Sequence, residues 1–283
     1  GWIGVICLLL LSVACSRKEA DYTIAVSQCS EDDWRAQMNK EILREALFYP
    51  GVNVEVYQAH DDNAHQIKDI ESLIERKVDL LIVAPNEAEA ITPVIEKAYD
   101  AGIPVILVDR KINSKKYTAY VGADNYEIGR KAGEYIADRL GGKGRVIEIT
   151  GLRGSTPAVE RHRGMMEALK AAPGVQVVAS AEAGWFRQKA GEVMDTLLDA
   201  HPQVNLVFAQ NDRMAIGAYE KARQKNRAGQ IAFVGVDAVA GGVESVAEGK
   251  LDATFIYPTG GDKVIQVAMA ILLGEPYQRE NIL

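Results

Sequence analysis

From Asp21 onward the chain alternates short, almost wholly apolar runs with longer amphipathic stretches. The apolar runs predict β-strands at residues 22–26, 52–57, 78–84, 103–108, 118–122, 145–149, 175–180, 204–209, 231–236 and 251–257. The stretches between them, such as WRAQMNKEILREALF and AGEVMDTLLDAH, have the periodicity of helices. Near-continuous Val, Ile and Leu runs separated by helices are typical of parallel sheets covered on both faces. About ten such strands exceed one comfortable sheet, so the pattern predicts an α/β protein with two lobes.

The first residues have a different pattern. Residues 2–15 read WIGVICLLLLSVAC without a charge, and the polar residues SRKEAD follow. A run of this length fits the core of a signal peptide, which needs about 7 to 15 apolar residues, better than a membrane span, which needs about 20. We therefore predict that residues 1–20 form a signal peptide or a membrane-proximal segment. A longer membrane segment upstream and a buried element of the fold are the alternatives.

Composition and charge narrow the class of protein. With 283 residues, 48% of them hydrophobic and 25% charged, the chain can form two packed cores. Its formal charge of -7 is spread without blocks of like charge, which argues against nucleic acid as a partner. If Cys7 leaves with the signal peptide and Cys15 carries a lipid, Cys29 remains alone, and a disulfide framework is excluded.

Polar residues follow several of the predicted strands where those strands end. Asp109 and Arg110 come directly after VILV, Asn211 follows LVFAQ, and Asp237 follows FVGV. A single aspartate in such a place is often a helix N-cap. In open α/β sheets, however, ligands bind in the crevice outside the carboxyl ends of the strands. Together these residues predict a binding site at the sheet edges.

No enzymatic motif accompanies this arrangement. The chain has no G-x-S-x-G, H-E-x-x-H, G-x-G-x-x-G or G-x-x-x-x-G-K-[ST] motif. The segment HDDNAH at residues 60–65 is more typical of a solvated turn than of a metal site. We therefore expect a binding module without catalytic residues, metal or cofactor.

Five motifs in the expected order resemble the ribose-binding branch of the type I periplasmic binding proteins, a fold that LacI-type repressors share. They are VILVDR, GADNYEIGRKAGEYIA, PAVERHRG, AHPQVNLVFAQNDRMAIGA and VGVDAV. The resemblance implies two Rossmann-like lobes joined by a hinge of three crossovers. It places residues 21–123 plus 258–283 in the N-terminal lobe and residues 124–257 in the C-terminal lobe. The ending SVAC resembles a bacterial lipobox, which implies lipidation of Cys15.

The same resemblance implies the binding residues: Asp109, Arg110, Arg161, Trp185, Asn211 and Asp237, with Trp34 at the first-lobe aromatic position. Asp33 stands where the family has a second aromatic residue, and Tyr257 stands where it has a glutamine. Aspartate and arginine form charge-assisted hydrogen bonds with sugar hydroxyls, and aromatic rings cover the apolar faces of a sugar. The implied ligand is a monosaccharide, with fructose as the first candidate and ribose as the second.

Three settings are open for such a module. One is the periplasmic, membrane-attached input domain of a hybrid two-component sensor, where it could dimerise. The second is a lipid-tethered receptor of an ABC importer, with a permease as its partner. A LacI-type repressor is the weaker third option, because a DNA-binding region needs roughly 50 to 60 residues before the first strand and only 21 are present. The segment GEPYQRENIL stops where the third crossover and last strand of the family should follow, which predicts that the polypeptide continues past Leu283.

Overall fold

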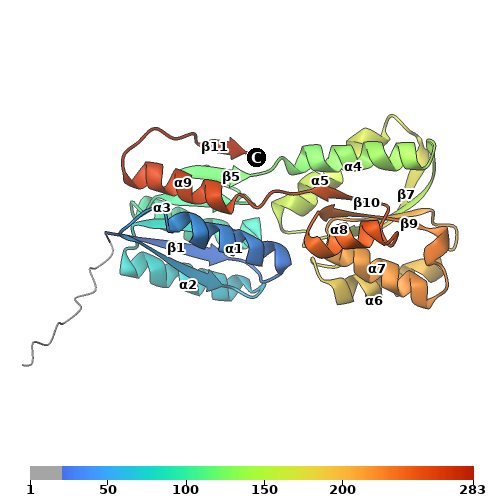
Figure 1. Ribbon diagram of the computed structural model, residues 1–283, viewed down its shortest axis with the longest axis horizontal. Coiled ribbons are helices and arrows are strands. Elements are labelled where there is room, and N and C mark those ends of the chain that lie inside the picture. Colours follow the sequence, from blue (N-terminus) through green and yellow to red (C-terminus); the bar gives the residue numbers. More distant parts are fainter. Residues whose placement is uncertain (1–20) are drawn as a thin grey trace, which may run out of the picture.

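The computed structural model of the chain describes residues 21–283. The predicted signal segment and Cys15 lie outside these residues. Two parallel sheets with helices on both faces form two lobes that lie side by side (Figure 1). The two-lobed α/β fold predicted from the sequence is therefore confirmed.

The first sheet has the strand order β11-β5-β4-β3-β1-β2. Its strands are β1 Tyr22–Gln28, β2 Val52–Gln58, β3 Leu80–Val83, β4 Val105–Val108, β5 Ala119–Gly122 and β11 Glu280–Ile282. Helices α1 Asp33–Ala46 and α9 Gly261–Leu272 cover one face of this sheet, and α2 Asn63–Arg76 and α3 Ala88–Asp100 cover the other. Alternate residues of the inner strands β1, β3, β4 and β5 point into one or the other of two cores, so these strands are apolar at nearly every position.

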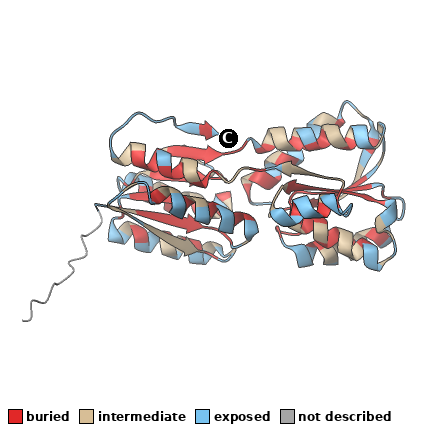
Figure 2. Cartoon of the chain, in the orientation of Figure 1, coloured by how far each residue is buried: buried red, intermediate tan, exposed pale blue. Residues whose placement is uncertain are grey.

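The second sheet has the order β10-β9-β8-β6-β7. Its strands are β6 Lys143–Thr150, β7 Gly174–Glu182, β8 Leu206–Ala209, β9 Ala232–Asp237 and β10 Ala253–Ile256. The helices of this lobe are α4 Asn125–Arg139, α5 Thr156–Leu169, α6 Arg187–Ala200, α7 Asp212–Gln224 and α8 Ala240–Ala247, with a short 3-10 helix at Ala228–Gln230. Figure 2 shows that the central strands of both sheets are buried and that the helices turn their exposed residues outward. The four edge strands, β2, β7, β10 and β11, are only partly buried.

All ten predicted strands occur, and sequence reasoning missed only β11 among the strands of residues 21–283. This strand has three residues and lies at the edge of the first sheet, where it pairs with β5. Its middle residue Asn281 is buried and donates from Nδ2 to the main-chain oxygen of Tyr120, 3.1 Å away. Because β11 has the sequence ENI, it contains only one apolar residue. The hydrophobic pattern from which the other strands were predicted is therefore missing here.

The described chain passes between the lobes twice. It leaves the first sheet after β5 and enters α4 at Asn125, and it returns after β10 through residues 257–260 to α9. The third crossover that the resemblance implies is not among residues 21–283. In this part of the chain no helix combines the length and the apolar composition that a membrane crossing requires.

Helices α4 and α5 pack unusually close, and two glycines make this possible. A Cβ atom on Gly129 would lie 2.1 Å from the main-chain oxygen of Arg161, and one on Gly164 would lie 2.0 Å from that of Tyr126. Both obstacles are backbone atoms, which cannot move aside unless the helices separate. The contact fixes the position of α5, the helix that carries Arg161.

We expect Gly164→Ala to lower the free energy of unfolding by about 1 to 3 kcal/mol, because the added methyl group overpacks this contact. The matched control is Gly241→Ala in α8, where a Cβ atom meets nothing within 4 Å. Chemical denaturation should show the control to be as stable as the wild type or slightly more stable. Equal stability of the two variants would contradict the packing argument.

Candidate ligand-binding site

A cavity lies between the lobes, at the carboxyl ends of strands from both sheets. It encloses about 350 Å³ of space free of protein atoms, its open mouth included. The residues that line it are Asp32, Trp34, Arg35, Asp109, Arg110, Pro157, Arg161, Trp185, Asn211, Asp237 and Tyr257. The structure thus brings together every binding residue predicted from the sequence except Asp33.

The placement of Asp33 differs from the prediction. Asp33 is exposed in the first turn of α1 and does not line the cavity. The residue beside Trp34 that does line the cavity is Arg35, which the sequence analysis missed. The helix starts from its N-cap Asp32, whose Oδ1 accepts from the main-chain nitrogen of Arg35, 2.7 Å away. This start turns Trp34 and Arg35 inward and Asp33 outward.

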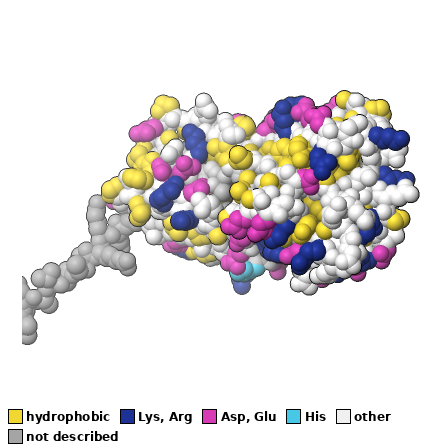
Figure 3. All heavy atoms as spheres, turned by 45° about the vertical axis from the view of Figure 1, so that its right-hand side comes forward, with side chains coloured by type: hydrophobic (Ala, Val, Ile, Leu, Met, Phe, Trp, Pro, Cys, Tyr) yellow, Lys and Arg dark blue, Asp and Glu magenta, His cyan; other side chains and the backbone are white. Residues whose placement is uncertain are grey.

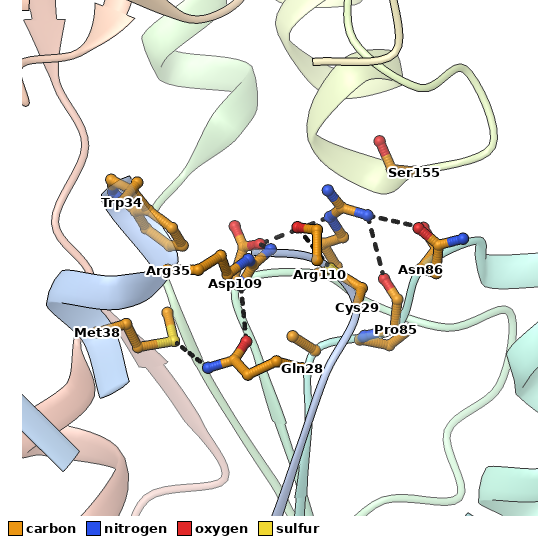
Figure 4. A network of polar contacts seen from close by, with 12 residues as sticks. Gln28, Cys29, Trp34, Arg35, Met38, Pro85, Asn86, Asp109, Arg110 and Ser155 are labelled. Atoms are coloured by element: carbon orange, nitrogen blue, oxygen red, sulfur yellow. Dashed lines mark hydrogen bonds and ion pairs between the residues drawn. The ribbon is translucent and has the colours of Figure 1, made fainter. Parts of the chain in front are cut away.

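Asp109 is the centre of the first-lobe half of the site (Figure 4). Its Oδ2 accepts from Nη2 of Arg35 in a buried ion pair and lies 3.6 Å from Nε of Arg110. Its Oδ1 accepts a short hydrogen bond from the hydroxyl of Tyr257. Burial by itself would raise the pKa of Asp109, but the guanidinium groups of Arg35 and Arg110 outweigh it and hold that pKa below its ordinary value. The carboxylate is therefore ionised inside the cavity.

Arg161 is the centre of the second-lobe half. Its Nε donates to Oδ1 of Asn125, 2.9 Å away, and its Nη1 donates to the main-chain oxygen of Gln210. The same Nη1 lies 3.9 Å from Oδ1 of Asp237, and the guanidinium carbon lies 4.3 Å from the ring centroid of Tyr257. Arg161 is 2% exposed. These contacts fix a cation against the wall of the cavity.

Aromatic rings form the remaining walls. The rings of Trp34 and Tyr257 stack with centroids 5.0 Å apart, and Nε1 of Trp34 donates to the main-chain oxygen of Tyr257, 2.9 Å away. The guanidinium carbons of Arg110 and Arg161 each lie 5.7 Å from the ring centroid of Trp185. Such rings present flat apolar surfaces inside an otherwise charged cavity.

Two residues that line the cavity carry a buried donor without a hydrogen-bond partner in the described part of the chain. Nε1 of Trp185 and Nε of Arg110 are both buried without a hydrogen bond. Buried donors of this kind cost free energy unless they are paired, and they are rare in native proteins. The cavity thus combines charged groups, aromatic rings and buried donors without a hydrogen bond, the kinds of group that bind a polyhydroxylated molecule.

The second lobe holds a further pair of carboxyl groups, of which Asp237 lines the cavity and Asp212 is buried near it. Burial raises the pKa of Asp237 well above its ordinary value, although Arg161 opposes the rise. Burial likewise raises the pKa of Asp212 to about 6, although the hydroxyl of Thr254 donates to its Oδ1 from 2.6 Å and opposes the shift. Oδ2 of Asp212 is buried and, within residues 21–283, has no hydrogen-bond partner. This half of the site therefore holds carboxyl groups that retain protons more readily than Asp109 does.

Contacts between the lobes surround the cavity. The main-chain nitrogen of Ala88 donates to the main-chain oxygen of Gly154, 3.0 Å away, and that of Lys111 donates to Oγ1 of Thr156, 2.9 Å away. On another side Nη1 of Arg213 lies 3.8 Å from Oδ2 of Asp32. The lobes therefore stand in a closed arrangement.

The histidines of the HDDNAH segment and Cys29 do not form a metal site with other described residues. Among residues 21–283 no group of three His, Cys, Asp or Glu side chains could hold a metal ion. His60 and His65 of the HDDNAH segment are exposed, with ring centroids 5.7 Å apart. Cys29 is buried, with its sulfur 3.6 Å from Oγ of Ser30.

Two parallel-sheet lobes closed over a polar cavity at their strand ends define the bilobed binding proteins. The sequence agrees, because residues 24–276 match the model of the periplasmic binding protein domain. The chain belongs to this family.

The chain is similar to several characterised members of the family. It is 35% identical to the ribose import binding protein RbsB of Salmonella typhimurium over 230 residues, which cover 81% of this chain and 77% of that protein. The fructose-binding periplasmic domain of the hybrid two-component system BT1754 is 53% identical, with a TM-score of 0.92 over 93% of this chain and 88% of that one. A Mycobacterium smegmatis protein in complex with β-D-fucofuranose is 31% identical, with a TM-score of 0.87 over 92% and 88% of the two chains.

The raised pKa of Asp212 predicts a specific pH dependence of stability. The carboxyl group binds a proton up to about pH 6 in the folded state, against 3.8 ordinarily. Between pH 3.8 and pH 6 the folded state binds more protons at this group than the unfolded state does. The protonated Asp212 side chain therefore contributes to stability at pH 4, and this contribution is lost as the pH rises through 6. In Asp212→Asn the free energy of unfolding should fall less from pH 4 to pH 7 than in the wild type, by up to about 3 kcal/mol.

Urea denaturation at a series of pH values measures this difference. The control is Asp33→Asn, at an exposed aspartate outside the cavity. Parallel pH curves for Asp212→Asn and the wild type would show that Asp212 is not the group responsible.

Proposed function

We propose that this domain binds a free monosaccharide in the interlobe cavity, with fructose as the first candidate and ribose as the second. The observation that carries the proposal is the convergence of charged and aromatic side chains from both lobes on one cavity. The sugars bound by relatives support it, because these relatives include a fructose-binding sensor domain and a ribose import binding protein.

Charged residues of the cavity are suited to bind the hydroxyl groups of a sugar, and aromatic residues are suited to cover its ring. Asp109 accepts from hydroxyl groups, while Arg110 and Arg161 donate to their oxygens; charge-assisted bonds of this kind are stronger than neutral ones. Trp34 and Trp185 cover the apolar C–H faces of the ring. Asn211 and Asp237 complete the second-lobe wall. None of these roles requires a covalent step, so we infer a binding module without catalysis or cofactor.

Arg35 distinguishes this cavity from one lined by two first-lobe aromatic residues. It forms the ion pair with Asp109, and its Nη1 donates to Oε1 of Gln28, 3.4 Å away (Figure 4). The guanidinium of Arg35, which lines the cavity beside Trp34, presents hydrogen-bond donors, whereas an aromatic ring would present only a flat apolar face. We infer that Arg35 contributes to the choice among sugars and favours a ligand with an additional acceptor near Asp109.

Closure of the lobes is the proposed consequence of binding. A ligand held by residues of both lobes binds the closed form better than the open form, and this difference in affinity shifts the population. The contacts of Lys111 with Thr156 and of Arg213 with Asp32 are available only when the lobes are closed.

We infer that the domain is the periplasmic, membrane-attached input of a hybrid two-component sensor. The 53% identity to the sensor domain, against 35% to the importer receptor, favours this setting. The alternative is the lipid-tethered receptor of an ABC importer. The downstream coding sequence separates them: a sensor continues into an apolar run of about 20 residues and signalling domains. A stop codon soon after Leu283, beside permease genes, would exclude the sensor.

Binding calorimetry against a panel of pentoses and hexoses tests the ligand directly. We expect fructose to bind with a dissociation constant near micromolar, which corresponds to about 8 kcal/mol. Ribose should bind more weakly than fructose. The absence of heat and of a thermal shift with every sugar in the panel would overturn the proposed function.

Substitutions should rank the residues of the site. Asp109→Asn should weaken binding by about 2 to 5 kcal/mol, because buried donors lose an ionised acceptor. Trp185→Ala should cost about 1 to 3 kcal/mol, because it removes a stacking surface and no charge. Calorimetry measures both, with Asp33→Asn as the control that should bind like the wild type. Wild-type affinity in a correctly folded Asp109→Asn variant would show that the ligand binds elsewhere.

A further inference from the structure

The outer face of α1 is apolar and basic at the end of the first lobe that lies away from the cavity. Lys40, Leu43, Arg44 and Leu47 follow one another at helical spacing, and Phe48 continues the face just past the helix. Leu47 is 81% exposed, Phe48 73% and Leu43 47%. We call these five residues the α1 patch. Large apolar side chains this exposed and this close together mark interaction surfaces.

The acidic residues of the same half of α1 do not belong to the patch. The carboxylate of Glu41 accepts from the hydroxyl of Thr259 and from the main-chain nitrogen of Gly261, 3.3 Å away. That of Glu45 accepts from Nε2 of Gln266, 3.1 Å away. Both carboxylates are thus turned toward α9 and the segment before it. The patch itself presents two cations and three apolar side chains.

The patch lies next to the point where the described chain begins. After Phe48 the chain turns through Gly51, whose main-chain oxygen accepts from the nitrogens of Asp21 and Tyr22 at 2.7 and 3.1 Å. In Figure 1 this turn meets the start of the coloured ribbon at the far end of the lobe. Figure 3 shows hydrophobic side chains at this end, beside the grey atoms.

The sequence before Asp21 limits how far the patch can be from a bilayer. Residues 2–15 are apolar, and the five residues SRKEA separate Cys15 from Asp21. An extended chain spans at most about 3.6 Å per residue, so this linker reaches about 20 Å. If Cys15 is lipidated, or if the apolar run is a membrane anchor, the bilayer surface comes within reach of the patch.

We propose that the α1 patch rests on the surface of an anionic lipid bilayer, with Leu47 and Phe48 in the headgroup region and Lys40 and Arg44 against the lipid phosphates. The proposal rests on the predicted membrane attachment of the chain. Apolar side chains bordered by basic ones are what interfacial helices use to bind anionic lipid. A second copy of the chain fits less well, because a two-fold contact through this face would bring the cations of both patches into one interface without a carboxylate of the patch to balance them.

Fluorescence quenching by lipid tests the proposal. The whole chain is reconstituted into vesicles of phosphatidylglycerol and phosphatidylcholine, with and without bromine on the acyl chains next to the headgroups. A tryptophan is introduced by Phe48→Trp, and the matched control is Phe186→Trp, at a residue of the second lobe that is 42% exposed. Brominated lipid should quench the tryptophan of Phe48→Trp at least about twofold more than that of the control. Adding Lys40→Gln and Arg44→Gln should reduce the difference.

Equal quenching of the two variants would overturn the proposal. So would protection of the Phe48→Trp fluorophore from acrylamide in detergent when the protein concentration rises, since a second copy would then cover the patch. Calorimetry of the double variant Leu47→Ser with Phe48→Ser should give the wild-type affinity for sugar. Failure of the lipid contact is thus distinguishable from failure of the proposed sugar site.

Discussion

The buried carboxylate of Asp109 is the interaction on which the arrangement of the cleft depends. An isolated ionised carboxylate in a protein interior is expensive, and proteins retain one only with cations and donors around it. Here the groups come from three separate parts of the chain: Arg35 from α1, Arg110 from the end of β4 and Tyr257 from the passage between the lobes. Removing Arg35, the close ion-pair partner, would leave the carboxylate poorly compensated, and breaking a buried ion pair in this way typically costs about 3 to 5 kcal/mol.

The backbone at Asp109 has an unusual conformation. Its φ of 64° places a non-glycine residue in the left-handed region, which is uncommon and costs free energy. Trp185 on the other side of the cavity has a φ of 77°, and its ring lies so close to Gly151 that a Cβ atom there would be 2.2 Å from it. Strained backbone in two facing walls of one cavity is typical of a site that is shaped before its ligand arrives.

The strands, and the polar residues that follow them, could be predicted from the sequence because both depend on the local order of apolar and polar residues. Strands buried on both faces read as apolar runs, and the polar residues after them lie at the carboxyl ends of their sheet. Asp109 could therefore be placed at that end of the first sheet, and Asn211 and Asp237 at that end of the second. Arg35 could not, because an arginine in an amphipathic helix reads as a surface residue. Its burial follows from a partner 74 residues away in the chain. The raised pKa of Asp212 likewise depends on packing that no local pattern of residues encodes.

Tyr257 connects recognition of a ligand with motion of the lobes. It lies at the second passage between the lobes, where its hydroxyl donates to Asp109 of the first lobe and accepts from Nδ2 of Asn125, 3.2 Å away, at the start of the second. Asn125 in turn accepts from Arg161. A rotation about the passages would change the distances among these groups, and a ligand that pairs with Asp109 and Arg161 would resist that change. Tyr257 therefore both lines the cavity and lies on a passage between the lobes, so a ligand that binds beside it acts directly on that passage.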